Sequence, residues 1–217
     1  MKRLLTLTYI AVLVLFSANP VLAGTSNGDK SDQNKKGTDY ESRFKKGSSE
    51  FGVQLGWGSA VDIPPGADRT DWEFAYFAPN YKYNLTGIVG KSFYRGSLSW
   101  MNEANVAVAH APTTAVIAGF SPLMLEYKFL QPKAQWAPSI FGGAGFSYTD
   151  WNDYDRQREI ATNFEFLLHL GVGAEFYKSK YGAFSANYRY FHVSNAGMKF
   201  PNIGVNANLF TVGYAFD

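Results

Sequence analysis

From Ser49 onward the dominant period of the sequence is two, with large apolar side chains at alternate positions of successive segments. In residues 51–57 they alternate with glycine and glutamine, and in residues 210–216 with threonine, glycine and alanine. Successive side chains of a β-strand point to opposite faces, so each segment has one large apolar face and one small or polar face. Because the aromatic residues lie on the large face, the pattern is typical of a membrane barrel with lipid outside and a polar interior.

Eight segments of this kind follow one another: 49–58, 72–87, 93–108, 114–129, 136–149, 162–177, 181–194 and 206–216. An even number suits a closed antiparallel barrel, whose closure removes the exposed edges. The connections after the odd-numbered segments are mostly the longer ones, as expected for long extracellular loops and short periplasmic turns; 109–113 is a short exception. We therefore predict an all-β fold, an eight-stranded antiparallel transmembrane β-barrel over residues 49–217.

The region before the barrel divides into two parts. Residues 1–23 are typical of a secretory signal peptide, with Lys2 and Arg3 before an apolar run and Ala23 at the expected cleavage position. Residues 24–48 are polar and rich in glycine, serine and charge, which predicts a flexible tail. After cleavage near Ala23, the barrel is expected to be an integral protein of the outer membrane of a Gram-negative bacterium.

The composition excludes several classes of function. The chain has 20 Lys+Arg against 18 Asp+Glu, so it lacks the concentrated positive charge of most nucleic-acid-binding proteins. It has no cysteine, which excludes a disulfide scaffold, a thiolate zinc site and a cysteine nucleophile. Three histidines leave little room for a histidine-rich metal centre. We expect no metal or other cofactor and no nucleic-acid partner.

A barrel of eight strands has an interior only wide enough for side chains, which disfavours a porin. Charged residues on the small-residue face of the segments should then fill this interior. We predict that they form a satisfied polar network rather than a catalytic site. The candidates are Glu103, Glu126, Lys128, Glu165, His169, Glu175 and Arg189.

The segment 181–194 contains the one constellation with reactive chemistry. His192 and Ser194 share the outward parity of its aromatic residues and lie roughly 7 Å apart along the strand. Polar side chains facing lipid are costly unless they are used. Because serine is a weak nucleophile without an adjacent base, Ser194 is the candidate nucleophile and His192 its base. The alternative is that both simply lie in the interfacial band of the membrane.

A hairpin centred on residue 200 would place Ser194 near Asn206 and His192 near Asn208, with both asparagines facing outward. An asparagine carbonyl can hold a histidine in the correct tautomer, as in Cys-His-Asn proteases. Asn206 is therefore the third catalytic candidate and Asn208 a supporting one. Candidate oxyanion donors follow the serine directly, namely the backbone N–H groups of Asn195, Ala196 and Gly197 and the Asn195 side-chain amide.

The run His192-Val193-Ser194-Asn195-Ala196-Gly197, followed by Lys199, Pro201-Asn202 and Gly204, resembles the lipid A 3-O-deacylase (PagL) family of outer-membrane enzymes. A softer match covers 138–145, Ser121-Pro122-Leu123 and Tyr127, so that the resemblance spans most of 93–217. It implies an eight-stranded barrel whose outer surface carries a serine nucleophile and a histidine base. It also implies hydrolysis of the acyl ester at the 3-position of lipid A without a metal.

The chain departs from this family at one catalytic position. The family has a glutamate fourteen residues after the histidine, and this sequence has Asn206 there. An asparagine cannot stabilise an imidazolium by charge, so the departure bears directly on activity. Loop carboxylates at Asp150, Asp153, Asp155 and Glu159 lie near the same rim of the barrel, but the sequence does not fix their reach.

The leading hypothesis is a serine esterase acting on lipid A, the anchor of lipopolysaccharide, in the outer leaflet of the membrane. Two alternatives remain open at this point. One is a non-enzymatic barrel with a structural or adhesion role, which Asn206 favours. The other is a related esterase acting on phospholipid with the same Ser-His pair. Whether the protein works as a monomer or a homodimer is also left open by the sequence.

Overall fold

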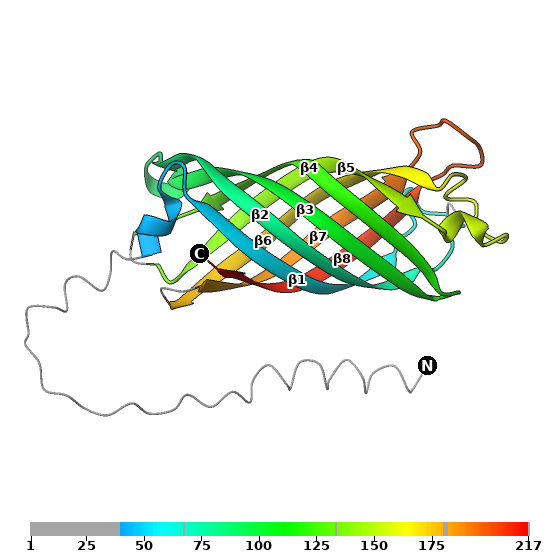
Figure 1. Ribbon diagram of the computed structural model, residues 1–217, viewed down its shortest axis with the longest axis horizontal. Coiled ribbons are helices and arrows are strands. Elements are labelled where there is room, and N and C mark those ends of the chain that lie inside the picture. The colour runs from blue at the N-terminus through cyan, green and yellow to red at the C-terminus, as the bar shows by residue number, and fades with distance from the viewer. Residues whose placement is uncertain (1–39, 67, 133, 180–181, 217) are drawn as a thin grey trace, which may run out of the picture. The chain divides into compact units, whose positions relative to one another are not determined.

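The computed structural model describes residues 40–217, apart from 67, 133, 180–181 and 217. Each strand pairs antiparallel with the next, and β1 pairs with β8 to close the barrel (Figure 1). The strands are β1 Ser49–Ala60, β2 Glu73–Val89, β3 Gly96–Ala111, β4 Ala115–Phe129, β5 Trp136–Thr149, β6 Phe164–Ser179, β7 Gly182–Ser194 and β8 Val205–Phe216. The predicted fold is confirmed, and each predicted segment boundary lies within three residues of the observed one.

The remaining regular elements are three short 3₁₀-helices: η1 Tyr40–Phe44, η2 Ser92–Tyr94 and η3 Trp151–Asp153. No helix in the described part of the chain is long and apolar enough to cross a membrane. The connections β1–β2, β5–β6 and β7–β8 are long and lie at one end of the barrel, opposite the end that carries η1 (Figure 1). The β3–β4 connection at the long-loop end has only residues 112–114.

The predicted signal peptide, residues 1–23, lies outside the described residues, and so does most of the predicted tail. Residues 40–48, however, belong to the barrel, so the predicted tail extends too far. Phe44 is only 2% exposed and packs edge-on against Tyr177 of β6, with ring centroids 5.7 Å apart. Arg43 forms an ion pair with Glu50 at 3.0 Å. The tail was predicted from the polar composition of this stretch, which did not indicate that Phe44 would be buried or that Arg43 would form an ion pair.

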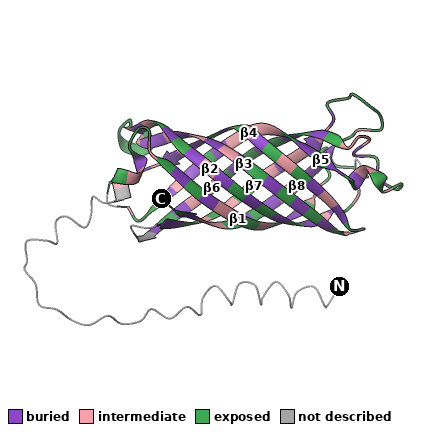
Figure 2. Ribbon diagram, in the orientation of Figure 1, coloured by how far each residue is buried: buried purple, intermediate pink, exposed green. Residues whose placement is uncertain are grey.

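Burial alternates along the strands as the sequence predicts (Figure 2). On β8, Leu209 is fully buried whereas the next residue, Phe210, is 62% exposed. On β1, Phe51 and Leu55 are exposed while Gln54 is buried. The outer surface is therefore covered by large apolar side chains, which a lipid environment would accept at no cost, and the inner face is filled by the smaller or polar set.

A layer of charged residues fills the interior near the end that carries η1. Lys82 lies 2.9 Å from both Glu126 and Glu175, and Lys128 lies 2.6 Å from Glu175. Glu50 approaches both lysines at 3.5–3.6 Å. Charges buried this deeply are tolerated because each has partners of opposite sign.

A second buried polar group lies further along the interior. Arg189 is fully buried and donates two hydrogen bonds to Glu103, at 2.7 and 3.1 Å, and one to Gln54 at 2.8 Å. Tyr76 also donates to Glu103, and His169 contacts Ser121 at 2.9 Å. Six of the seven predicted residues lie in these two groups, whereas Glu165 is buried apart from them, with Thr162 as the hydrogen-bond partner of its Oε1. Together with the first layer, the second group places buried polar side chains along the barrel interior.

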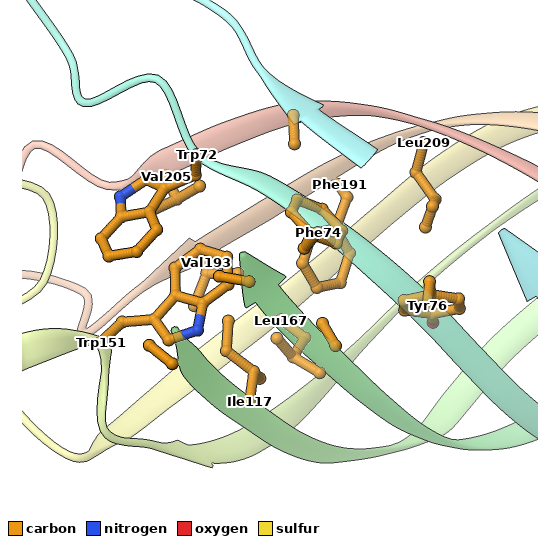
Figure 3. Close-up of a cluster of buried hydrophobic side chains, with 14 of the residues drawn as sticks. Trp72, Phe74, Tyr76, Ile117, Trp151, Leu167, Phe191, Val193, Val205 and Leu209 are labelled. Carbon is orange, nitrogen blue, oxygen red and sulfur yellow. The ribbon is translucent and has the colours of Figure 1, made fainter. Parts of the chain in front are cut away.

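The long-loop end of the interior is apolar (Figure 3). Trp72, from the β1–β2 connection, stacks on Trp151 of η3 with ring centroids 4.4 Å apart. Phe191 and Val193 of β7 are fully buried in this cluster, beside Phe74 of β2. The cluster therefore holds the end of β7 from inside the barrel, which decides where the intervening residues point.

We expect Glu103→Ala to destabilise the barrel by about 3–5 kcal/mol, because Arg189 is left charged and buried without its main partner. Unfolding by denaturant in lipid vesicles measures the change. The control replaces both partners, Glu103→Leu with Arg189→Met, and should recover much of the loss because no buried charge remains. A single variant as stable as the wild type would contradict this role for the pair.

Candidate active site

His192 and Ser194 lie on the outer surface at the C-terminal end of β7, where the strand enters the β7–β8 loop. Both are partly exposed, whereas their neighbours Phe191 and Val193 are buried in the apolar cluster. Because strand side chains alternate, anchoring the buried pair directs the polar pair outward. The His192 Nε2 and Ser194 Oγ atoms are 3.0 Å apart, which is within hydrogen-bond distance.

The partner of His192 on the neighbouring strand is Asn206, the first outward residue of β8. Its Oδ1 lies 2.6 Å from His192 Nδ1. The expected pairing of Ser194 with Asn206 and of His192 with Asn208 is wrong by two residues, because the hairpin is centred on residue 199 rather than 200. A shift of one residue in the centre moves every partner by two, and so leaves the outward parity unchanged.

Asn208 consequently does not reach His192. It lies opposite Tyr190 in the sheet, and its Oδ1 accepts a hydrogen bond from Tyr188 Oη at 2.7 Å. The predicted supporting role of Asn208 is therefore not one of direct contact with the histidine. The structure brings together Ser194, His192 and Asn206 as a continuous chain of hydrogen-bonding groups.

Asn206 is only 3% exposed, and its amide has three partners. Besides facing His192, Oδ1 accepts a hydrogen bond from Tyr190 Oη. Nδ2 donates to the backbone carbonyl of Ile63 in the β1–β2 connection, at 2.9 Å. Neither partner was predicted from the sequence. Tyr190 is one of many outward-facing aromatic residues, and a sequence does not indicate which backbone carbonyl will accept a hydrogen bond.

The turn after the serine is held by the side chain of Asn195, which is fully buried. Its Nδ2 donates to the Lys199 carbonyl and its Oδ1 accepts from the Gly197 N–H, both at 3.0 Å. The Asn195 N–H donates to Asn202 Oδ1 at 3.2 Å. Two of the three predicted backbone donors, and the Asn195 amide, are thus engaged in the turn itself. Within the described residues, the Ala196 N–H has no hydrogen-bond partner.

The backbone of this turn takes a left-handed conformation at two successive positions, with φ of +55° at Ala196 and +81° at Gly197. An alanine in this region is uncommon and costs roughly 1 kcal/mol or more. The hydrogen bonds of Asn195 on either side make the conformation tenable. The turn is therefore a built feature of the chain next to Ser194 rather than a loose connection.

The loop returns to β8 through Gly204, which packs directly against His192. A Cβ atom on Gly204 would lie 2.7 Å from His192 Cε1, closer than carbon atoms approach. Gly204 also has a φ of +72°. Its N–H donates to the Glu159 carbonyl at 3.0 Å, and Arg69 Nε donates to its carbonyl at 3.1 Å. Two other loops therefore hold Gly204 against the imidazole.

The loop carboxylates do not supply the charge that Asn206 lacks. Both Glu159 oxygens are engaged by Thr70, through its N–H at 2.6 Å and its Oγ1 at 3.2 Å. Asp150 caps the N–H of Val116 at 2.6 Å. Across the described ranges of the chain, His192 takes part in no ion pair. The site is thus a Ser-His-Asn arrangement with a neutral third member.

The sequence and the fold were compared with those of known proteins. A family model described as lipid A 3-O-deacylase (PagL) matches residues 69–215, which include the whole Ser-His-Asn arrangement. No match was found among curated protein sequences.

Three solved structures are similar to this chain to different degrees. The crystal structure of the outer membrane enzyme PagL superposes with a TM-score of 0.52 at 18% identity, covering 77% of this chain and 99% of that one. The outer membrane protein OprG from Pseudomonas aeruginosa has a TM-score of 0.40 at 10% identity, covering 78% and 96%. Ail of Yersinia pestis has a TM-score of 0.37 at 13% identity, covering 78% and 100%.

At these identities the likeness to solved structures concerns the fold alone. The family model, in contrast, extends over well more than half of the sequence and through the site. The chain therefore belongs to the lipid A 3-O-deacylase (PagL) family.

Proposed function

We propose that the protein is an outer-membrane serine esterase that removes the ester-linked acyl chain at the 3-position of lipid A. The single observation that carries the proposal is the 3.0 Å approach of His192 Nε2 to Ser194 Oγ on the outer surface of a barrel of this family. A histidine nitrogen at this distance can take the hydroxyl proton as the oxygen attacks.

The reaction follows from this geometry in two stages. Ser194 Oγ attacks the ester carbonyl carbon while His192 Nε2 takes the hydroxyl proton. The tetrahedral intermediate collapses when the imidazolium returns that proton to the departing sugar oxygen, which leaves an acyl-enzyme on Ser194. Water, deprotonated by the same nitrogen, then attacks the acyl-enzyme and releases the 3-hydroxy fatty acid and free Ser194.

The negative charge that forms on the carbonyl oxygen needs a hydrogen-bond donor close to Ser194. Among the predicted donors, the Asn195 and Gly197 N–H groups are engaged in the turn, and the Ala196 N–H is the remaining one. We assign the oxyanion contact to Ala196 N–H, with Asn195 and Gly197 holding the turn that presents it. The left-handed backbone at Ala196 and Gly197 then serves this presentation.

The surroundings of Ser194 fit a lipid substrate. Ser194 lies opposite Phe166, and His192 opposite Leu168, both exposed apolar residues on the outer face of β6. An acyl chain that remains among the membrane lipids can therefore reach the serine without entering the barrel. If the long loops are extracellular, as in other outer-membrane barrels, the site faces the lipopolysaccharide leaflet of a Gram-negative outer membrane.

A carboxylate next to the histidine both orients the ring and stabilises the imidazolium, whereas Asn206 can perform only the first of these tasks. It can hold His192 with a proton on Nδ1, which leaves Nε2 free to accept the serine proton. It cannot stabilise the imidazolium by charge, so a lower rate than that of an acid-containing site is expected. The proposal requires one barrel only, and no finding supports the homodimer that the sequence left open.

Ser194→Ala should abolish release of the 3-hydroxy fatty acid, lowering turnover by at least about a thousandfold, since the nucleophile is lost. Mass spectrometry of lipid A from cells expressing each variant measures it. Ser59→Ala, an exposed serine of β1, is the control and should behave as wild type. If wild type leaves lipid A intact but cleaves phospholipid vesicles, the phospholipid esterase is correct; if it cleaves neither, the barrel is non-enzymatic.

Asn206→Leu should lower kcat by about tenfold to a hundredfold, because His192 loses the acceptor that fixes its tautomer. Asn208→Leu makes the same change two residues along β8, where the amide contacts Tyr188 instead. We expect it to change kcat less than twofold. Equal losses in the two variants, measured with purified protein on lipid A in detergent micelles, would argue against a specific role for Asn206.

Gly204→Ala should reduce activity severely while the barrel still folds, because the new methyl group displaces the imidazole from Ser194. Gly66→Ala is the matched control, since Gly66 also has a positive φ, of +80°, but nothing lies within 4 Å of its would-be Cβ. Both variants should show the wild-type shift in electrophoretic mobility on heating that marks a folded barrel. Similar activity in the two would show that the contact with His192 is unimportant.

A further inference from the structure

The side chain of Asn206 can serve His192 in only one of its two orientations. An amide has an accepting oxygen and a donating NH₂ group at ends of nearly identical shape. When Oδ1 faces His192 Nδ1, that nitrogen carries the proton and Nε2 is free to accept from Ser194. When NH₂ faces Nδ1, the proton is forced onto Nε2, which then cannot take the serine proton. A carboxylate, whose two oxygens are equivalent, has no such ambiguity.

One group near Asn206 distinguishes the two ends by chemistry. The Ile63 carbonyl is an acceptor only, and it lies 2.9 Å from Nδ2. Turning the amide over would put two oxygens in contact at this position, and Asn206 is too deeply buried for water to separate them. The carbonyl is itself held close to β8, because the Val61 N–H donates to the Asn206 carbonyl at 2.8 Å.

A second group holds the oxygen end in place. Tyr190 Oη donates to Oδ1, so the oxygen accepts from Tyr190 and His192 together. Tyr190 projects from the same face of β7 as His192, and the two rings are nearly parallel, with an interplanar angle of 11°. A phenol can both donate and accept, but with Nδ2 fixed on the Ile63 carbonyl the Tyr190 hydroxyl donates to the second lone pair of Oδ1 and opposes rotation of the amide away from the imidazole.

We propose that the Tyr190 hydroxyl and the Ile63 carbonyl form an orientation lock that keeps the Asn206 oxygen on His192 Nδ1. Tyr190 is in this view a positioning residue, which acts on the reaction only through Asn206. The lock lets a neutral amide perform the orienting task that the family resemblance assigns to a glutamate. The inference rests on the proposed function for its purpose, but its structural content, the tautomer of His192, can be observed without any substrate.

The first test reads the tautomer directly. Nitrogen NMR of the full-length protein in detergent micelles, with isotope-labelled histidine, distinguishes a protonated ring nitrogen from a bare one. The chain has three histidines, so His192 can be assigned by comparison with His192→Gln. We expect wild type to show the proton on Nδ1, and Tyr190→Phe to show a smaller share of this tautomer, because the Ile63 carbonyl then holds the amide alone. An unchanged spectrum in Tyr190→Phe would overturn the proposal.

Tyr188→Phe is the matched control for this substitution. Tyr188 lies two residues earlier on the same face of β7, and it donates to Asn208 as Tyr190 donates to Asn206. Both changes remove one hydroxyl and retain the ring. A change in the His192 tautomer in Tyr188→Phe equal to that in Tyr190→Phe would mean that the outer surface responds generally to loss of a hydroxyl, which would overturn a specific lock.

The second test is a double-mutant cycle with Asn206→Asp, whose two equivalent oxygens leave no wrong end to face His192, although one of them then lies against the Ile63 carbonyl and lowers the stability of this background. In the wild-type background, Tyr190→Phe should lower kcat about tenfold with KM nearly unchanged, the loss expected for one neutral hydrogen bond. In the Asn206→Asp background the same change should cost less than about threefold. A tenfold loss in both backgrounds would show that Tyr190 acts by packing or substrate contact instead.

The two proposals fail in different ways. If wild type has no esterase activity but Tyr190→Phe shifts the tautomer, the proposed function is wrong and the lock is supported. If wild type is active and Tyr190→Phe changes neither the tautomer nor kcat, the proposed function stands and the lock is wrong.

Discussion

Every strand residue of an eight-stranded barrel must point either to the surrounding lipid or into an interior with room only for side chains. This constraint decides the site, because on β7 it assigns Phe191 and Val193 to the interior and therefore His192 and Ser194 to the outside. Polar side chains on the outer face would be an energetic burden in lipid unless they were paired with one another. Here they are paired with each other, at 3.0 Å, and the proposed esterase function rests on this pairing.

The interior divides into a charged part and an apolar part. Charged layers around Lys128 and Arg189 fill the part of the barrel away from the site. Towards the long loops the interior becomes apolar, and the stacked rings of Trp72 and Trp151 join two of those loops to the strands. The side of β7 opposite His192 and Ser194 therefore packs in a buried apolar cluster, and close packing of this kind holds the backbone of the site in position.

The neutral third residue changes how the site must be built. A carboxylate stabilises the imidazolium by charge and accepts a hydrogen bond through either oxygen, whereas an amide offers one acceptor and no charge. The contacts of Asn206 with Tyr190 and with the Ile63 carbonyl address the first difference and not the second. In the proposed mechanism, orientation and charge stabilisation are thus separated, and the β1–β2 loop takes part in the first through the Ile63 carbonyl.

Much of the fold was predictable because the period of two extends through the chain. Side-chain alternation depends only on local backbone geometry, so strand positions, the outward parity of Ser194 and His192, and the polar interior could all be inferred from it. The family motif after the serine narrowed the chemistry further. The boundary of the tail was misplaced because one buried ring, that of Phe44, carries no periodic signal.

The sequence by itself therefore determined the barrel, the two faces of each strand, and the residues from which a site could be assembled. Only the tertiary structure decided that His192 meets Asn206 rather than Asn208, because that depends on the centre of a hairpin whose ten-residue loop is shaped by contacts with other loops. Only the tertiary structure also showed that Asn206 donates to the Ile63 carbonyl. Every residue has a backbone carbonyl, so the sequence cannot indicate which one, here 143 residues away, will be the acceptor.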